Sequence, residues 1–246
     1  MCAMGGFREK TAASHTLADV AAAACAHGGD PSLSAQEKDN AEKFDKKFLQ
    51  FKAHKNLTMR AGALTLRLLD GGDAAALTQW LGDARVLAFY EGRDRAHTPE
   101  MVHTHFYRAD GVLRMMALLN GTRVGYLQMY PLSEEERAAY GCGEVRACGI
   151  DLFIGEPELW GKGLGRRMVA AALSWLFDVC GAQAAYLDPR EENVRAIRCY
   201  KACGFVCKKR LPAHEMHEGA LRDCVLMECT PERLKRAELP PFYLLN

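Results

Sequence analysis

The stretch that most constrains the fold of this chain is GIDLFIGEPELWGKGLGRRMV, residues 149–169. It begins as an apolar run typical of a buried strand and leads within ten residues into the spaced glycines Gly161, Gly163 and Gly165 and a helical pattern. A glycine turn before a helix exposes backbone N–H groups, and the helix adds the positive end of its dipole, so such a unit can bind an anion. A lone carboxylate, Asp151, interrupts the apolar run. The pattern predicts an enzyme that holds a phosphorylated cofactor beside Asp151.

Composition is typical of a soluble globular protein. With 246 residues and 49% apolar content, the chain can bury a sizeable core. The formal net charge of +1 gives no overall attraction to nucleic acid, and no run approaches the roughly 18 apolar residues of a membrane helix. The ten cysteines include no CxxC pair and form no disulfide framework. We therefore predict reduced thiols, a cytoplasmic protein, no nucleic-acid partner and no membrane association.

The first 58 residues differ from the rest and are predicted to be an extension, partly helical or disordered. Residues 7–26 weakly resemble a signal peptide, but Asp19 interrupts their alanine-rich stretch, which favours a cytoplasmic chain. Residues 34–55 are charged and predict a short appended amphipathic helix. Its apolar face would consist of Phe44, Phe48 and Phe51.

The main domain is predicted over residues 59–232, with a C-terminal tail over 233–246. Met59 directly precedes the first strand pattern, which leaves two translation starts open, Met1 and Met59. Strand and helix patterns then alternate, which indicates an α/β layer. We expect strands at 63–69, 111–120, 123–132, 147–154, 184–188, 204–210 and 221–229 and helices at 73–83, 98–107, 164–180 and 191–203. Asn120-Gly121 predicts a hairpin turn, and 133–146 a loop.

The glycine turn does not fit two common phosphate-binding motifs. A dinucleotide fingerprint needs a further glycine where Arg166 stands, and the Walker pattern is absent. Taken alone, the turn could be only a tight connection. A second element, NVRAIRCYKACGF at 193–205, reads as an amphipathic helix that begins at Asn193 and ends at Gly204.

Together, in this order, the two elements resemble the GNAT superfamily of acyl-CoA N-acyltransferases over about residues 63–230. The resemblance implies a mixed, largely antiparallel sheet flanked by helices, with a splayed central strand pair that holds acetyl-CoA. It assigns cofactor binding to the strand end, the turn and the later helix: Phe153, Ile154, Trp160, Gly161, Lys162, Gly163, Leu164, Gly165, Arg166, Asn193 and Ala196. The family usually has Gln or Arg where Trp160 stands, so one phosphate contact departs from its pattern.

Within the superfamily the chain is most similar to aminoglycoside 6'-N-acetyltransferases, especially the type fused to an aminoglycoside phosphotransferase. The similar stretches are 80–94, 125–130, 149–165, 187–205 and 211–228. The resemblance implies direct acetyl transfer from acetyl-CoA to the 6'-amine of an aminoglycoside, which confers resistance.

The residues fit that chemistry. A primary amine is mostly protonated near neutral pH and must lose a proton before it attacks a thioester, so a base is needed. Asp151 can serve, either directly or through water, and its neighbours Ile150, Leu152 and Phe153 should raise its basicity by desolvation. Tyr200 lies near the thioester sulfur in the family and would protonate the departing thiolate. The structural alternatives are that Asp151 only faces a loop or pairs with an arginine, and that Tyr200 is only packed near the thioester.

A polycationic acceptor requires several carboxylates around the base. The candidates for the acceptor site, which include aromatic walls and hydrogen-bonding groups, are Trp80, Tyr90, Glu91, Asp94, Gln128, Tyr130, Asp151, Asp188, Glu215, Glu218 and Asp223. Each of these acidic residues taken singly could equally be a solvated surface charge.

Other readings stay open. HEMHE at 214–218 places its histidines three apart where a zinc motif needs four, in a predicted loop, so we expect no metal. A cysteine acyl-enzyme is not excluded by the sequence. The main rival function is N-acylation of a protein amino terminus or a small metabolic amine, and a second is a CoA-binding sensor without turnover.

Overall fold

The computed structural model describes residues 35–53, 57–143, 146–235 and 242–245. They form a sheet with the strand order β7-β8-β6-β5-β4-β3-β2-β1-β9, in which β5 and β6 are parallel and all other neighbours antiparallel. The strands are β1 (Thr58–Ala61), β2 (Leu64–Leu68), β3 (Leu113–Leu119), β4 (Thr122–Pro131), β5 (Ala147–Ile154), β6 (Ala184–Leu187), β7 (Val206–His217), β8 (Ala220–Cys229) and β9 (Phe242–Leu245). The expected mixed, largely antiparallel sheet is confirmed.

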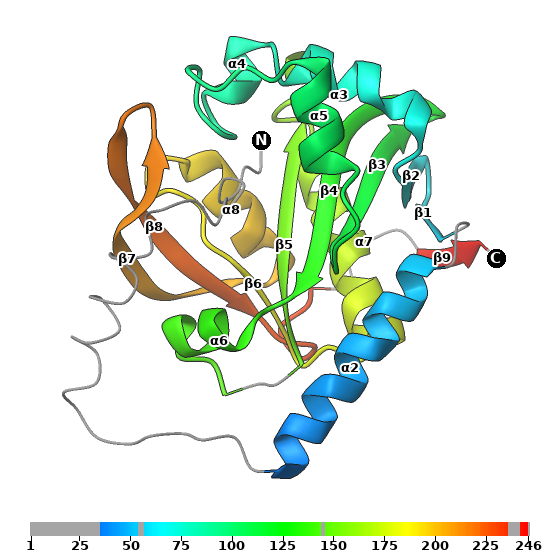
Figure 1. Cartoon of the computed structure of the whole chain (residues 1–246), viewed down its shortest axis with the longest axis vertical. Coiled ribbons are helices and arrows are strands. Elements are labelled where there is room, and N and C mark those ends of the chain that lie inside the picture. The colour runs from blue at the N-terminus through cyan, green and yellow to red at the C-terminus, as the bar shows by residue number, and fades with distance from the viewer. Residues whose placement is uncertain (1–34, 54–56, 144–145, 236–241, 246) are drawn as a thin grey trace.

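Helices cover both faces of the sheet (Figure 1). The α-helices are α2 (Ala35–Ala53), α3 (Ala74–Trp80), α4 (Ala84–Leu87), α5 (Pro99–Phe106), α6 (Glu134–Tyr140), α7 (Leu164–Ser174) and α8 (Val194–Cys203). Short turns η1 (Gly71–Asp73) and η2 (Pro157–Leu159) precede α3 and α7, and the π-helix η3 (Trp175–Cys180) continues α7. The large core lies between the sheet and the α2, α7 and α8 layer, and a smaller core lies beneath α3, α4 and α5.

Local sequence accounts for several of these elements. Asn120 and Gly121 both have positive φ, as the turn between β3 and β4 requires. Thr98 caps α5 by accepting a hydrogen bond from the Met101 amide, and Pro99 occupies its first turn. The predicted hairpin and helix start are confirmed.

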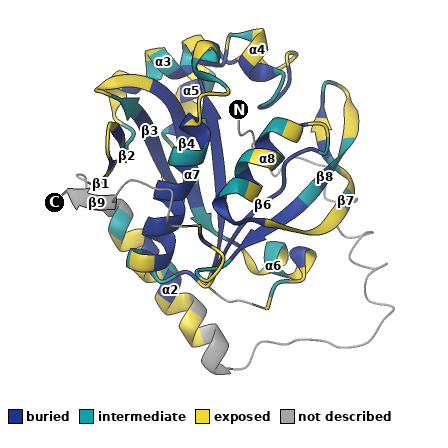
Figure 2. Ribbon diagram, turned by 180° about the vertical axis from the view of Figure 1, so that it is seen from behind, coloured by how far each residue is buried: buried dark blue, intermediate teal, exposed yellow. Residues whose placement is uncertain are grey.

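The predicted amphipathic helix is present as α2, but it is packed into the domain. Phe44 and Phe48 are buried, and the Phe48 ring lies 5.7 Å from that of Trp175. Lys47 donates to the carbonyl oxygens of Val179 and Cys180 at 3.1 Å each, which places a cation at the C-terminal end of η3. Figure 2 shows that the buried side of α2 faces the core and that its other side is exposed.

Two sequence-based element predictions were wrong. Residues 133–146 are not all loop, because Ser133 and Glu136 form a capping box that starts α6. The strand predicted over 204–210 begins at Val206 as β7 and continues to His217, so the first four residues of HEMHE lie in a strand and not in a loop. Bulges near Lys209 and between Leu211 and Glu215 break the alternation of β7. The helix predicted over 164–180 is confirmed, as α7 to Ser174 and as the π-helix η3 from Trp175 to Cys180.

Two short strands, β1 and the edge strand β9, were not predicted. β1 and β9 have four residues each and pair antiparallel, which adds chain from the predicted C-terminal tail to the sheet. The predicted domain limits at residues 59 and 232 stay a proposal. The segment 7–26, read above as a weak signal-peptide likeness, lies outside the described residues.

Candidate active site

The central strand pair separates partway along β5. The β5–β6 ladder runs only from Ala147↔Ala184 to Gly149↔Tyr186, whereas β5 continues to Ile154 and stays paired with β4 to its end. Figure 1 shows the two strands diverging toward the end that carries the glycine turn. The backbone of β5 beyond Gly149 therefore has no strand neighbour on its β6 side among the described residues. An extended ligand with amide groups can pair with such an edge.

The glycine turn follows at the end of this free edge. Gly161 and Gly163 have φ values of 74° and 77°, in the left-handed region, and both are exposed. Gly163 is the N-cap residue of α7 and has no side chain to satisfy the first helical amides. A Cβ at either position would meet nothing within 4 Å, so the left-handed backbone and not crowding is what favours glycine. The turn has the form of an anion site at a helix N-terminus.

Trp160 ties this turn to the strand. Its indole N–H donates to the Ile154 carbonyl oxygen at 3.0 Å, so this donor is used within the chain. The guanidinium of Arg195, on α8, lies 4.6 Å from the Trp160 ring centre and 4.9 Å from that of Phe89. A positive charge therefore lies beside the turn. Arg195 was not among the cofactor-binding residues predicted from the sequence.

Asp151 is buried at the middle of β5, directly opposite Gln128 on β4. The Gln128 side-chain amide donates to one carboxylate oxygen, and the Tyr130 hydroxyl donates to the other at 3.1 Å. A side chain at Gly149 would overlap the Tyr130 ring, so glycine there gives Tyr130 the room to reach Asp151. The carboxylate is thus held by two donors from the neighbouring strand.

Burial raises the pKa of Asp151 well above its ordinary value, and the nearby Asp188 charge raises it further. The hydrogen bonds from Gln128 and Tyr130 act in the opposite direction. The predicted increase in basicity is confirmed, but its expected cause was partly wrong. Ile150 and Leu152 point into the core on the opposite face of the sheet, because side chains alternate along a strand.

Asn193 and Ala196, which the sequence assigned to cofactor binding, have structural roles in α8. Asn193 is buried and caps α8 by accepting a hydrogen bond from the Ala196 amide at 3.2 Å. Ala196 and Tyr200 are fully buried on the inner face of α8, where the Tyr200 ring lies 5.8 Å from that of Phe205.

Trp80 and Tyr90, the predicted aromatic walls of the acceptor site, pack against Phe153. Tyr90 and Trp80 lie 4.8 and 6.1 Å from the ring of Phe153, which is on the same face of β5 as Asp151. The Trp80 indole donates to Glu156 at 2.8 Å, and a side chain at Gly155 would overlap its ring. These contacts hold the end of β5 against α3.

Most of the predicted acceptor carboxylates are paired with groups of this chain. Asp188 accepts from the Tyr140 hydroxyl and lies 2.8 Å from the His214 ring nitrogen. Glu215 pairs with Arg190 at 2.9 Å, and burial raises the pKa of Glu215 to about 7.

Two further predicted carboxylates, Glu218 and Asp223, are also paired with arginines. Arg93 pairs with Glu218 at 2.6 Å and lowers the pKa of that carboxyl to about 2, and Arg210 pairs with Asp223 at 2.5 Å. Asp94 is exposed. Glu91 is buried and lies 3.6 Å from His97. The acidic character expected from the sequence is therefore partly neutralised by arginines.

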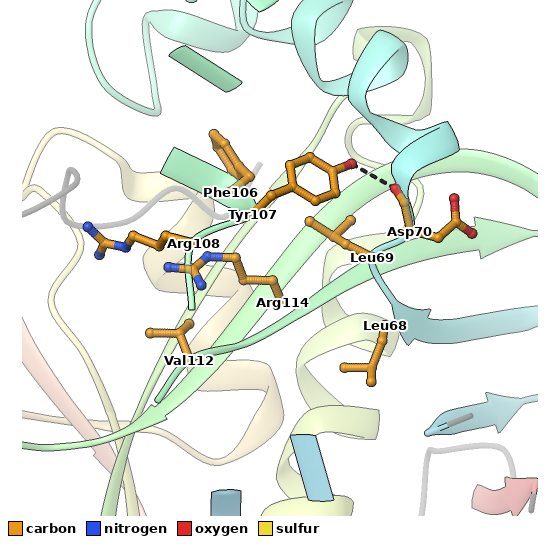
Figure 3. A pocket seen from close by; sticks show the side chains of 8 residues that line it. All are labelled: Leu68, Leu69, Asp70, Phe106, Tyr107, Arg108, Val112 and Arg114. Atoms are coloured by element: carbon orange, nitrogen blue, oxygen red, sulfur yellow. Dashed lines mark hydrogen bonds between the residues drawn. The ribbon is translucent and has the colours of Figure 1, made fainter. Parts of the chain in front are cut away.

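A cavity of about 390 Å³ opens on the α5 side of the sheet (Figure 3). It is lined by Leu68, Leu69, Asp70, Phe106, Tyr107, Arg108, Val112 and Arg114. Arg114 lies opposite Gln128 in the β3–β4 ladder, and β4 separates this cavity from the Asp151 strand β5. Within the described ranges, no cluster of three His, Cys, Asp or Glu side chains could hold a metal, and no helix has the length and apolarity to span a membrane.

Comparison with known proteins identifies the family. The model of the acetyltransferase (GNAT) domain matches residues 70–212. The chain belongs to the GNAT acetyltransferase family. Relatives of this GNAT acetyltransferase include aminoglycoside N(6')-acetyltransferase type 1 of Klebsiella pneumoniae, with 31% identity over 157 residues, which are 58% of this chain and 74% of that protein. Spermidine N(1)-acetyltransferase of Vibrio cholerae is 23% identical over 171 residues, 65% of this chain and 88% of that protein.

Solved structures agree. The aminoglycoside acetyltransferase AAC(6')-Ib in complex with ribostamycin and coenzyme A superimposes with a TM-score of 0.58 and 27% identity, covering 72% of this chain and 98% of that one. Another structure of AAC(6')-Ib contains acetyl-CoA. Acetyl-CoA is the acyl donor of the GNAT acetyltransferase described here. The residues fit this donor, since the exposed turn with its uncapped helical amides suits a phosphate and the free β5 edge suits an amide chain.

Arg190, Arg195 and Tyr126 of this GNAT acetyltransferase were not predicted from the sequence. Arg190 is buried and joins the β7–β8 hairpin to the Ala88 carbonyl oxygen at 2.9 Å. Its position gives no sequence signal, because the pairing depends on the fold. Tyr126 could have been found, since it precedes Gln128 and Tyr130 on the same face of β4 with a period of two.

Proposed function

We propose that this GNAT acetyltransferase transfers the acetyl group of acetyl-CoA directly to the 6'-amine of aminoglycoside antibiotics and so confers resistance. The observation that carries the proposal is the buried Asp151 carboxylate on β5, which is held by Gln128 and Tyr130 of β4. Asp151 lies beyond Gly149, where the ladder between β5 and β6 ends. Its raised pKa suits a group that must accept a proton from an ammonium ion. The 31% identity to an aminoglycoside N(6')-acetyltransferase supports the choice of acceptor.

The reaction requires the nitrogen to lose two protons and the sulfur to gain one. In the proposal, Asp151 accepts the first proton from the ammonium ion, and the free amine then forms a bond to the acetyl carbon as the carbon–sulfur bond breaks. Tyr200 donates its hydroxyl proton to the departing thiolate, and the second nitrogen proton, lost as the amide forms, restores the Tyr200 hydroxyl. Gln128 and Tyr130 keep the Asp151 oxygens oriented toward the acceptor.

The donor would be bound by the free edge of Phe153 and Ile154, by the turn from Trp160 to Arg166, and by the start of α8 with Asn193 and Ala196. The negative phosphates would face the first amides of α7 and the positive charge of Arg195. The acceptor would lie against Trp80, Tyr90 and the carboxylates already described. We further propose a cytoplasmic location, in keeping with the free thiols of the described cysteines.

A second candidate acceptor is a small metabolic amine. The observation that favours it is the pairing of Glu215, Glu218 and Asp223 with arginines, which leaves fewer carboxylates for an acceptor with as many amines as an aminoglycoside. A protein amino terminus and a CoA-binding module without turnover are the remaining alternatives.

A thiol-release assay with acetyl-CoA separates these functions. The acceptors are aminoglycosides with and without a 6'-amine, spermidine and a peptide with a free amino terminus. We expect turnover only with the 6'-amino compounds and its near-complete loss in Asp151→Asn. Asp39→Asn on the exposed side of α2 makes the same chemical change as a control and should keep native activity. Turnover only with spermidine or the peptide would refute the acceptor, and CoA binding without turnover would refute the enzyme.

A further inference from the structure

We propose that Tyr126 is a positioning residue that fixes the orientation of the Gln128 side chain toward Asp151. The inference rests on the proposed role of Asp151 as the base. Tyr126 would act through Gln128 and not on the substrates.

The three side chains form one connected hydrogen-bond chain. The Tyr126 hydroxyl donates to Gln128 Oε1 at 2.6 Å, and Gln128 Nε2 donates to Asp151 Oδ2. Tyr126 and Gln128 are two residues apart on β4 and so share one face, opposite Asp151 on β5. The orientation of a single carboxamide therefore decides whether Asp151 meets an N–H donor or an oxygen.

The hydrogen bond between Tyr126 and Gln128 has a defined direction, which the charge of Arg114 favours. A tyrosine hydroxyl can donate or accept, so Tyr126 alone would permit either orientation of Gln128. The positive charge of Arg114 opposes the effect of burial on the pKa of Tyr126. A positive charge favours the Tyr126 hydroxyl as a donor, and its proton is directed to Gln128 Oε1.

The surroundings hold the Tyr126 end of this hydrogen-bond chain, which we call the relay. The fully buried Tyr126 ring packs at 5.0 Å from Phe106 and at 5.5 Å from Phe153. The nearby Arg114 is also buried and is held by two hydrogen bonds to Asp110, at 2.7 and 2.8 Å. This packing opposes a movement of the Tyr126 hydroxyl that would follow a rotated Gln128.

The relay has a predictable effect on proton affinity. The Gln128 donor lowers the pKa of Asp151 against the effect of burial. Without the Tyr126 hydroxyl, the carboxamide is free to turn its oxygen toward Asp151 for part of the time. The Asp151 carboxylate then loses a donor, so its pKa rises and less of the base is ionised at neutral pH.

The direct test is a carbon-13 NMR titration of the aspartate carboxyl groups in the full chain, with Asp151→Asn used to assign the Asp151 signal. We expect Tyr126→Phe to move the Asp151 midpoint upward by about half a pH unit or more. Tyr186→Phe is the matched control, because Tyr186 is equally buried and its hydroxyl bonds Glu228 instead. An unchanged midpoint in Tyr126→Phe, or the same change in both variants, overturns the inference whether or not the protein turns over substrate.

Kinetics provide the second readout. Tyr126→Phe should lower kcat about tenfold and should leave the KM for acetyl-CoA unchanged. This loss is smaller than the roughly 100-fold or greater effect of removing a general base, because Asp151 remains in place. In a Gln128→Leu background the same substitution should have no further effect, because Tyr126 acts through Gln128. An additive loss would contradict that route. If the native protein transfers acetyl to no amine, the proposed function fails, and the NMR titration still decides the relay.

Discussion

The buried arginine Arg190 connects the two segments that carry most of the predicted acceptor carboxylates. It donates to Glu215 and His217 on β7 and to the Ala88 carbonyl oxygen beyond α4. Replacing Arg190 with methionine would retain much of the apolar volume and remove the charge. An ionised Glu215 would then be buried without its counter-charge, which costs about 3 to 5 kcal/mol in comparable buried pairs. The carboxyl reduces this cost by taking up a proton.

The size of this loss should depend on pH. The pKa of Glu215 is about 7 in the folded chain against an ordinary value of 4.5, so the folded state loses stability as pH rises between these values. Arg190 holds this pKa down, and its removal extends the loss above pH 7. Below pH 5 the carboxyl is protonated with or without Arg190, and only the lost packing and the bond to Ala88 remain, about 1 to 2 kcal/mol.

Urea unfolding of the native protein and Arg190→Met at pH 5 and pH 8 measures both quantities. We expect a difference in unfolding free energy of about 1 to 2 kcal/mol at pH 5 and about 2 to 3 kcal/mol at pH 8, because the added loss is limited to the one pH unit above the native pKa of Glu215, or about 1.4 kcal/mol. Arg210→Met removes an exposed arginine that is also paired with carboxylates and should cost much less than Arg190→Met at both values, because water screens an exposed ion pair. A loss that is equal at the two pH values would refute the reasoning.

Three further predictions concern the acceptor site, the N-terminal helix and the turn. Arg93→Ala frees Glu218 and should lower the KM for a polycationic acceptor several-fold, while the KM for acetyl-CoA is unchanged; an unchanged acceptor KM would place Glu218 outside the acceptor site. Phe48→Ala removes a fully buried ring that packs on Trp175 and should lower the unfolding free energy by about 3 to 5 kcal/mol in urea; a loss below about 1 kcal/mol would show that α2 is not part of the core. Gly163→Ala forces a residue with a side chain into the left-handed backbone conformation and should weaken CoA binding, as measured by calorimetry. An unchanged affinity for CoA would contradict the role of the turn.

The sequence was informative where local patterns determine structure. The strand with Asp151, the glycine turn and the capped α8 all follow from short-range rules, and each is present. The capping box of Ser133 and Glu136 obeyed such a rule too, but its acidic helix resembles a solvated loop in composition.

Long-range pairing was beyond the sequence. Glu215 and Glu218 read as free acidic groups because Arg190 and Arg93 become their partners only when the β7–β8 hairpin meets the segment after α4. The strand predicted over 204–210 was shorter than β7, because the bulges of β7 hide the alternation expected of a strand. The burial of Asp151 could be inferred from its apolar strand, but the relay through Tyr126 depends on the register between β4 and β5.

The most direct test of the account is the identity of the reaction product. The protein is incubated with acetyl-CoA and an aminoglycoside that has a 6'-amine, or with its analogue that has a 6'-hydroxyl, and each product is analysed by mass spectrometry and NMR. The account predicts one added acetyl group, on the 6' nitrogen, and no product from the hydroxyl analogue. Acetylation at another amine, or of both compounds alike, would contradict it.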